Sequence, residues 1–188
     1  MTQYKILVDS NAYFRLALEV HPLLGKPFGQ KKYCLYIIEG FEREYLHSGR
    51  LQTKFHWVAE EKYSKNRQKK ITLSRAEKNR LNETKNFFKD AAISMDLTTG
   101  TVDIEALAIA YILKVPIVTD DGDMICLADE FEVSVIKVLE LMKLMLTEKL
   151  IDMEKIRAMV AYWRFIRDLP KNCDADYEKI YGEKSPKS

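Results

Sequence analysis

Carboxylates follow short apolar segments at two separate places in this sequence. The first is Asp9, which comes directly after the apolar residues 6–8. The second is a group of three acids that follows the apolar residues 115–119, namely Asp120, Asp121 and Asp123. Between these two places, Asp103 lies at the beginning of a helical pattern. Acids that crowd together repel each other, so a cluster of them is most simply stabilised by a cation.

Such acids could do chemistry if the fold brings them together. In open α/β sheets, ligands bind at the carboxyl ends of the strands, and divalent cations such as Mg²⁺ prefer carboxylate oxygens. Each acid also has a purely structural explanation, because Asp9 and Asp103 could be helix N-caps and Asp121 before Gly122 could be a turn residue. All three acids occupy strand ends or first helical turns, and this combination favours a metal site.

The hydrophobic pattern predicts alternating strands and helices that could position these acids. We expect strands at residues 6–8, 33–38, 115–119 and 133–138, and helices at residues 11–19, 40–47, 74–92, 101–113, 139–148 and 153–167. This β–α–β order predicts an α/β fold with three layers (α/β/α), in which helices cover both faces of a central, mostly parallel sheet.

The length of 188 residues fits one domain with additions. We predict a core domain at residues 1–138 that carries a basic helical insertion at about residues 49–95. A C-terminal helical extension at residues 139–181 would pack on this domain. Residues 182–188 would form a disordered tail.

Composition is that of an ordinary globular protein, with 47% hydrophobic and 31% charged residues. No apolar run approaches the roughly 20 residues that span a bilayer, and the N-terminus lacks the pattern of a signal peptide. The three cysteines and three histidines are scattered without metal-ligand spacing. We therefore expect a cytoplasmic protein with reduced cysteines and no membrane partner.

Lysine and arginine strongly outnumber acids between residues 62 and 80, although the net charge of the chain is only +2. Such a basic segment could hold the phosphates of a nucleic acid. The candidate RNA-binding residues are Lys65, Arg67, Lys69, Lys70 and Arg75. The alternative is a solvated helix face with its preceding loop.

The acidic segments resemble the ordered motifs of PIN domains, the metal-dependent ribonuclease domains of VapC-type toxins and RNA-processing nucleases. The matching segments are Val8-Asp9-Ser10-Asn11, a helical glutamate near residue 44, Val102-Asp103-Ile104-Glu105-Ala106-Leu107-Ala108-Ile109-Ala110, and Ile117-Val118-Thr119-Asp120-Asp121-Gly122-Asp123. The resemblance covers residues 4–137. The order of the motifs and their apolar flanks agree with the family.

The resemblance implies roles for individual residues. It makes Asp9, Glu44, Asp103 and Asp121 the catalytic acids, and Asp9, Asp103, Asp121 and Asp123 the ligands of one or two Mg²⁺ or Mn²⁺ ions. Asn11 and Thr119 would support these acids.

The acid of the second motif has three candidates, Glu39, Glu42 and Glu44. Glu44 is favoured because the apolar pair Tyr45-Leu46 follows it, as in the family. Glu42 is the second choice.

By this resemblance the chain would be a metal-dependent endoribonuclease that hydrolyses RNA phosphodiester bonds. It could be the toxin of a toxin–antitoxin pair, and an antitoxin protein would then be a partner. Two alternatives stay open. A structure-specific DNA nuclease or a phosphatase could use the same acids, and a catalytically weak PIN-like module could bind RNA without cutting it. The Met-rich residues 141–146 suggest core packing or a dimer surface, and we expect a homodimer.

Overall fold

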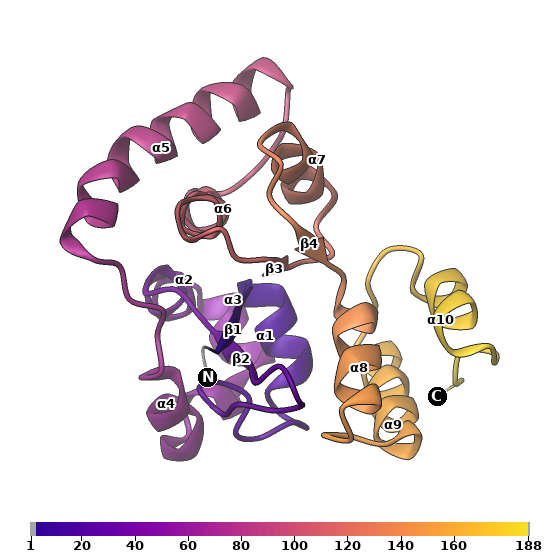
Figure 1. Cartoon of the computed structure of the whole chain (residues 1–188). Coiled ribbons are helices and arrows are strands. Elements are labelled where there is room, and N and C mark those ends of the chain that lie inside the picture. Colours follow the sequence, from indigo (N-terminus) through magenta and orange to yellow (C-terminus); the bar gives the residue numbers. More distant parts are fainter. Residues whose placement is uncertain (1–2, 188) are drawn as a thin grey trace.

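Four parallel strands form one sheet in the computed structural model, which describes residues 3–187 (Figure 1). The strands are β1 (Tyr4–Val8), β2 (Tyr33–Tyr36), β3 (Ile117–Val118) and β4 (Val135–Ile136), in the order β2-β1-β3-β4. Leu7 of β1 pairs with Tyr36 on one side and with Ile117 on the other. Because all strands are parallel, their carboxyl ends meet at one edge of the sheet.

Eleven helical segments are described within residues 3–187: α1 (Ser10–Leu16), α2 (Gly40–His47), α3 (Gly49–Lys54), the 3-10 helix η1 (His56–Ala59), α4 (Glu61–Arg67), α5 (Arg75–Ser94), α6 (Thr101–Leu113), α7 (Gly122–Glu130), α8 (Val138–Thr147), α9 (Met153–Phe165) and α10 (Cys173–Tyr181). Most of the predicted elements appear near their expected bounds. The helices α3, η1, α4, α7 and α10 are new.

The two faces of the sheet are covered by different helices, as Figure 1 shows. Ile6 and Val8 of β1 join a core that includes residues of α1, α8 and α9, whereas Leu7 joins a core with residues of α5, α6 and α7. Successive side chains of a strand point to opposite faces, so a fully apolar strand needs cover on both. The predicted α/β fold with a parallel sheet and three layers is thus confirmed.

The segment between β2 and α5 is part of the core rather than an addition to it. The ring of Phe55 stacks on Phe14 of α1 with the ring centroids 4.4 Å apart, and Trp57 and Tyr63 are also buried. Of the three short helices in this segment, η1 buries Trp57 and α4 buries Tyr63, whereas α3 buries no residue. Such short helices leave little periodicity in the sequence, so they were not predicted one by one.

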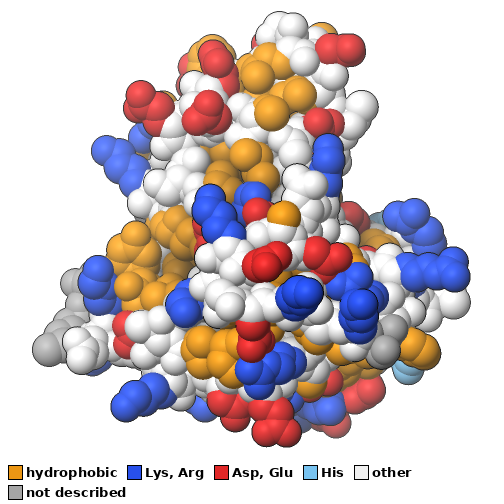
Figure 2. Space-filling model, turned by 90° about the vertical axis from the view of Figure 1, so that its right-hand side faces the viewer, with side chains coloured by type: hydrophobic (Ala, Val, Ile, Leu, Met, Phe, Trp, Pro, Cys, Tyr) orange, Lys and Arg blue, Asp and Glu red, His pale blue; other side chains and the backbone are white. Residues whose placement is uncertain are grey.

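The C-terminal helices share the same core. Trp163 of α9 is 1% exposed, and its Nε1–H donates to the backbone oxygen of Arg15 in α1 at 2.9 Å. Figure 2 views the molecule from the side of α8, α9 and α10, where basic and acidic side chains alternate with apolar patches. This face has no single-sign charge that would mark it as an RNA surface.

Several residues of the segment 183–186, for which a disordered tail was expected, have hydrogen bonds to the helices. Glu183 accepts hydrogen bonds from Arg157 of α9 and from the hydroxyl of Tyr177 in α10. Arg164 of α9 donates to the hydroxyl of Ser185 and to the backbone oxygen of Pro186. Paired charges therefore hold this segment against the helices. Ser188, which the prediction also included, lies outside the described residues.

The outer side of β2 is covered by loops. The N–H groups of Gly25 and Phe28 donate to the backbone oxygens of Leu35 and Tyr33, each at 2.9 Å. Beyond the strand, the N–H of Ile71 donates to the oxygen of Ile37 at 3.1 Å. Gly25 suits this loop because its φ is +70° and because a Cβ there would lie 2.8 Å from Cβ of Lys69.

No helix within residues 3–187 is long and apolar enough to cross a membrane.

Candidate metal centre

Asp9 lies where β1 ends and is the N-cap of α1. Its Oδ1 accepts a hydrogen bond from the Ala12 N–H at 2.6 Å, so the N-cap reading is correct. The residue is only 3% exposed, and Oδ2 finds no hydrogen-bond partner among the described residues. A buried carboxylate oxygen without a partner is costly, and a cation would relieve that cost. The two readings of Asp9 are therefore compatible.

Asp103 lies in the first turn of α6, next to the same edge of the sheet. Its Oδ2 accepts a hydrogen bond from the N–H of Gly100 at 3.3 Å. A Cβ at residue 100 would lie 3.0 Å from this oxygen, so glycine allows the close approach. The carboxylate is thereby held at the beginning of the helix.

Glu44 of α2 reaches the same place from the other side of β1. Its Oε2 accepts a hydrogen bond from the hydroxyl of Ser10, the neighbour of Asp9, at 2.5 Å. Glu42 instead pairs with Arg67 at 2.8 Å, and Glu39 is exposed before the first turn of α2. Of the three candidates, Glu44 is the one that shares a pocket with Asp103.

Asp121 is the N-cap of α7, just after β3. Its Oδ1 accepts from the Met124 N–H at 2.9 Å, and its own N–H donates to the hydroxyl oxygen of Thr119 at 3.1 Å. Thr119 is fully buried, and its hydroxyl also acts on Asp9 by lowering the pKa of that carboxyl. Thr119 thus connects the ends of β1 and β3, which agrees with the supporting role expected for it.

The four acids influence one another electrostatically. Burial raises the pKa of Asp9 from 3.8 to about 7, although the nearby Thr119 hydroxyl and the Ala12 N–H lower it, and the charge of Asp103 raises it further. Burial also raises the pKa of Asp103 to about 6, with added repulsion from Glu44 and Asp121. Asp103 therefore lies within electrostatic reach of the three other acids.

Two neighbouring acids have other partners. Asp123 accepts two hydrogen bonds from Thr98, one from its N–H at 2.8 Å and one from its hydroxyl at 2.6 Å, and these lower the pKa of Asp123. Asp120 pairs with Arg15 at 3.2 Å and accepts from the N–H of Val138. As it lies here, Asp123 fastens the loop before α6, and its role as a metal ligand stays a prediction.

Asn11, the other expected supporting residue, is exposed in the first turn of α1.

Arg67, which was predicted to bind RNA, is buried and has partners within the protein. Its side chain is 3% exposed, pairs with Glu42 and donates to the backbone oxygen of Val58 at 2.8 Å. Its guanidinium also lies 5.4 Å from the ring centre of Phe41. A cation enclosed in this way holds the core together and cannot reach a phosphate.

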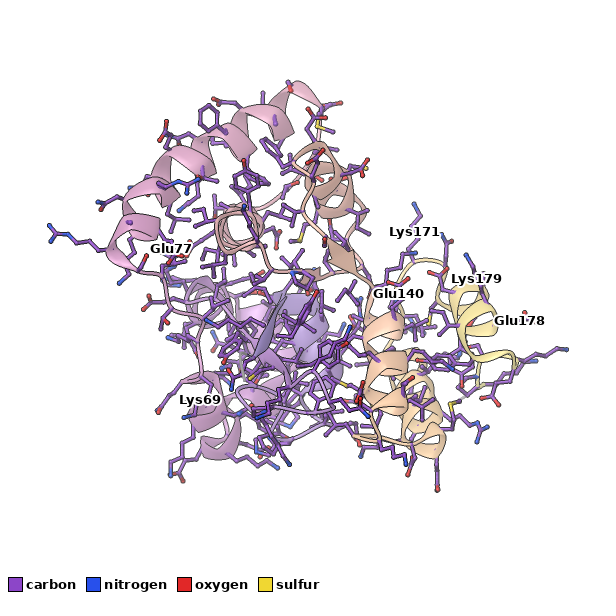
Figure 3. All side chains as sticks on the ribbon, in the orientation of Figure 1. Lys69, Glu77, Glu140, Lys171, Glu178 and Lys179 are labelled. Atoms are coloured by element: carbon purple, nitrogen blue, oxygen red, sulfur yellow. The ribbon has the colours of Figure 1, made fainter. Side chains whose placement is uncertain are left out.

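The other predicted RNA-binding residues are spread apart. Lys65 is exposed and pairs with Glu61 on α4 at 2.5 Å, while Lys70 lies in the loop beside Ile37 at the end of β2. Figure 3 shows Lys69 beside α4 and Glu77 at the beginning of α5. Arg80, further along α5, lines a pocket with Tyr4, the first residue of β1, so this part of α5 lies near the amino end of that strand.

A pocket of about 530 Å³ adjoins the acidic cluster. Glu44 and Asp103 line it together with two basic residues that the sequence analysis did not single out, Arg43 of α2 and Lys85 of α5. Arg43 is adjacent to the predicted acid Glu44, and this was the one feature of the sequence that could have indicated that Arg43 belongs to the site. Lys85 belongs to a long amphipathic helix that offered no such feature.

The donor set suits a hard divalent cation such as Mg²⁺ or Mn²⁺, because carboxylate oxygens from several elements converge and one of them is buried without a partner. Within residues 3–187, no three His, Cys, Asp or Glu side chains are already grouped closely enough to hold an ion. No protein-family model and no curated protein matches this chain.

Proposed function

We propose that this protein is a metal-dependent endoribonuclease of PIN type that hydrolyses RNA phosphodiester bonds. The observation that supports the proposal is that Asp103 lies within electrostatic reach of Asp9, Glu44 and Asp121, which come from different helices or strand ends. Asp9, Asp103 and Asp121, with Glu44 beside them, would hold one or two Mg²⁺ or Mn²⁺ ions.

The chemistry follows from charge. A phosphodiester is anionic and resists attack, and a divalent ion, when bound, neutralises its oxygens and lowers the pKa of water. The side chains of this site position the components. Ser10 orients Glu44 through its hydroxyl, and Thr119 connects Asp9 with Asp121. The buried Asp9 must lose its proton before it can serve as a ligand, because metal ligands bind in their deprotonated form.

A cleavage assay with RNA and DNA oligonucleotides of the same sequence tests this function. We expect cleavage of RNA in Mn²⁺, none in EDTA, and a loss of at least about a hundredfold in Asp9→Asn and Asp103→Asn, as expected when a ligand of a catalytic ion is removed. Asp129→Asn on the exposed side of α7 is the matched control and should cleave normally.

Other outcomes have definite meanings. Preferential cleavage of DNA would identify a DNA nuclease. RNA binding without metal-dependent cleavage would identify a binding module. A cytoplasmic location and an antitoxin partner are further parts of the proposal. If the protein is a toxin, its expression without the antitoxin should inhibit growth.

A further inference from the structure

Two basic side chains, those of Arg43 and Lys85, line the pocket together with Glu44 and Asp103. Arg43 Nη2 lies 2.5 Å from Oε2 of Glu105, and Lys85 Nζ lies 3.6 Å from the same oxygen. The side chain of Glu105 is 12% exposed, whereas that of Arg43 is 62% exposed and that of Lys85 is 33% exposed. Glu105 thus pairs with two cations that line the pocket, and most of its own side chain is covered.

The beginning of α6 contributes to the same place. Gly100, Thr101 and Val102 line the pocket, and the first bond of the helix runs from the Ile104 N–H to the oxygen of Gly100. The N–H groups that come before Ile104 in the first turn therefore have no acceptor within the helix. The dipole of α6, a helix of 13 residues, adds a partial positive charge at this end. The pocket therefore combines the acids Glu44 and Asp103 with two cations and the amino end of α6.

We propose that Arg43, Lys85 and the first turn of α6 bind a backbone phosphate of single-stranded RNA, adjacent to the phosphate that the acidic cluster would cut. This inference rests on the proposed function, because it places the two phosphates in one pocket. An anionic polymer needs cations next to a site formed by carboxylates, and Arg43 and Lys85 line the same pocket as Glu44 and Asp103.

A purely structural role would be different. Exposed ion pairs contribute little to stability, so the contact of Arg43 with Glu105 has a small effect on folding. If the two cations served only to neutralise Glu105, removing its charge would leave RNA binding unchanged. If they bind phosphate, Glu105 competes with the RNA, and Glu105→Gln should tighten binding.

The test measures binding of a fluorescent single-stranded RNA to the full-length protein in EDTA, where no cleavage occurs. We expect Arg43→Ala and Lys85→Ala each to weaken binding by about three- to tenfold and to reduce the slope of log K against log salt by about 0.7 per lost contact. Glu105→Gln should bind more tightly. Arg43→Lys and Lys85→Arg should restore most of the affinity.

Matched controls are available on the same elements. Lys89→Ala lies one turn beyond Lys85 on α5, and Arg50→Ala lies on the neighbouring helix α3; both residues are exposed and neither lines the pocket. These variants should keep the affinity and salt slope of the wild type. In Mn²⁺, the Arg43 and Lys85 variants should raise KM several-fold with kcat within about twofold.

The outcomes separate the two proposals. Unchanged binding by the Arg43→Ala/Lys85→Ala double variant, or no RNA binding by the wild type, would overturn the phosphate site even if the protein cleaves RNA. Binding that depends on Arg43 and Lys85 in a protein that never cleaves RNA would retain this site and reject the nuclease.

Discussion

At the scale of single residues, the acids of the candidate site lower the stability of the folded chain when they are ionised. Asp9 is buried with one free oxygen, and Asp103 is surrounded by other carboxylates. Neither arrangement favours the ionised form without a cation. The metal-free protein should therefore be sensitive to pH at these two positions.

The first prediction concerns the pH dependence of stability in EDTA. Folding raises the pKa of Asp9 from 3.8 to about 7 and that of Asp103 to about 6, so the native state binds more protons than the unfolded state. The stability that these protons contribute is complete below pH 3.8 and is lost as the pH rises through 6 and 7. Thermal melting between pH 5 and 8 should show this loss.

Substitution of Asp9 provides the contrast. Asp9→Asn can keep the bond from the Ala12 N–H but carries no charge, so at pH 8 in EDTA it should melt about 2–8 °C above the wild type. The pH dependence should also become flatter. A variant that melts below the wild type at pH 8 would contradict the proposed repulsion and burial cost.

The second prediction concerns Arg67. Removing one partner of a buried ion pair leaves the other charge uncompensated, so Arg67→Ala should lower the free energy of unfolding by about 3–5 kcal/mol. Lys65→Ala on the exposed side of α4 should change it by no more than about 0.5 kcal/mol. Urea denaturation measures both values. A large loss of RNA affinity in a stable Arg67→Ala protein would restore the original prediction for this residue.

At the scale of elements, the C-terminal helices support the site indirectly. Asp9 begins α1, and α9 packs against α1 through Trp163 and its bond to Arg15. Arg15 also pairs with Asp120 after β3 and with Asp168 after α9. The carboxyl edge of the sheet, where Asp9 and Asp120 lie, is thus connected to α9, a helix of the predicted C-terminal extension.

The third prediction tests this support. Trp163→Ala should destabilise the protein by about 3–5 kcal/mol, because it removes a buried aromatic ring and leaves the Arg15 oxygen without its donor. Phe165→Ala, two residues further on α9, removes a ring that is 77% exposed and should have little effect. Equal effects in thermal melting would mean that α9 is not fixed to α1 in this way.

The helices and strands also differ in how well the sequence predicts them. Long apolar or well-capped segments, such as α6 and α5, were predicted within a few residues. The helix α7 was missed because Asp121-Gly122 resembles a turn, and α10 because its buried residues are only Cys173 and Tyr177. The placement of Asp9 and Asp121 at one edge of the sheet was predictable because both follow parallel strands that pair with each other, but the burial of Arg67 depended on packing that local pattern does not encode.

At the scale of the whole molecule, the four acids come from helices on both sides of the sheet. Asp103 and Asp121 begin helices of one layer, whereas Asp9 begins a helix of the other. A cation held among them would connect the layers. Its binding energy would then appear as stability of the entire fold.

The fourth prediction follows from this connection. At 100 times its dissociation constant, a ligand that binds only the native state adds about 2.7 kcal/mol, so Mn²⁺ should raise the melting temperature by about 5–10 °C at pH 8. Asp9→Asn and Asp121→Asn should reduce this gain, and Asp129→Asn should keep it. Equal melting with and without Mn²⁺ would count against a metal centre.

The loops that bond to the outer side of β2 also bear on how this chain meets its own copies. An open sheet border is a template on which another molecule can add a strand and start aggregation. Here Gly25, Phe28 and Ile71 already occupy the hydrogen-bonding groups of that border, and β4 at the opposite border has only two residues. These bonds leave little free backbone for a strand of a second copy, so we expect a homodimer of this chain to form through helix surfaces.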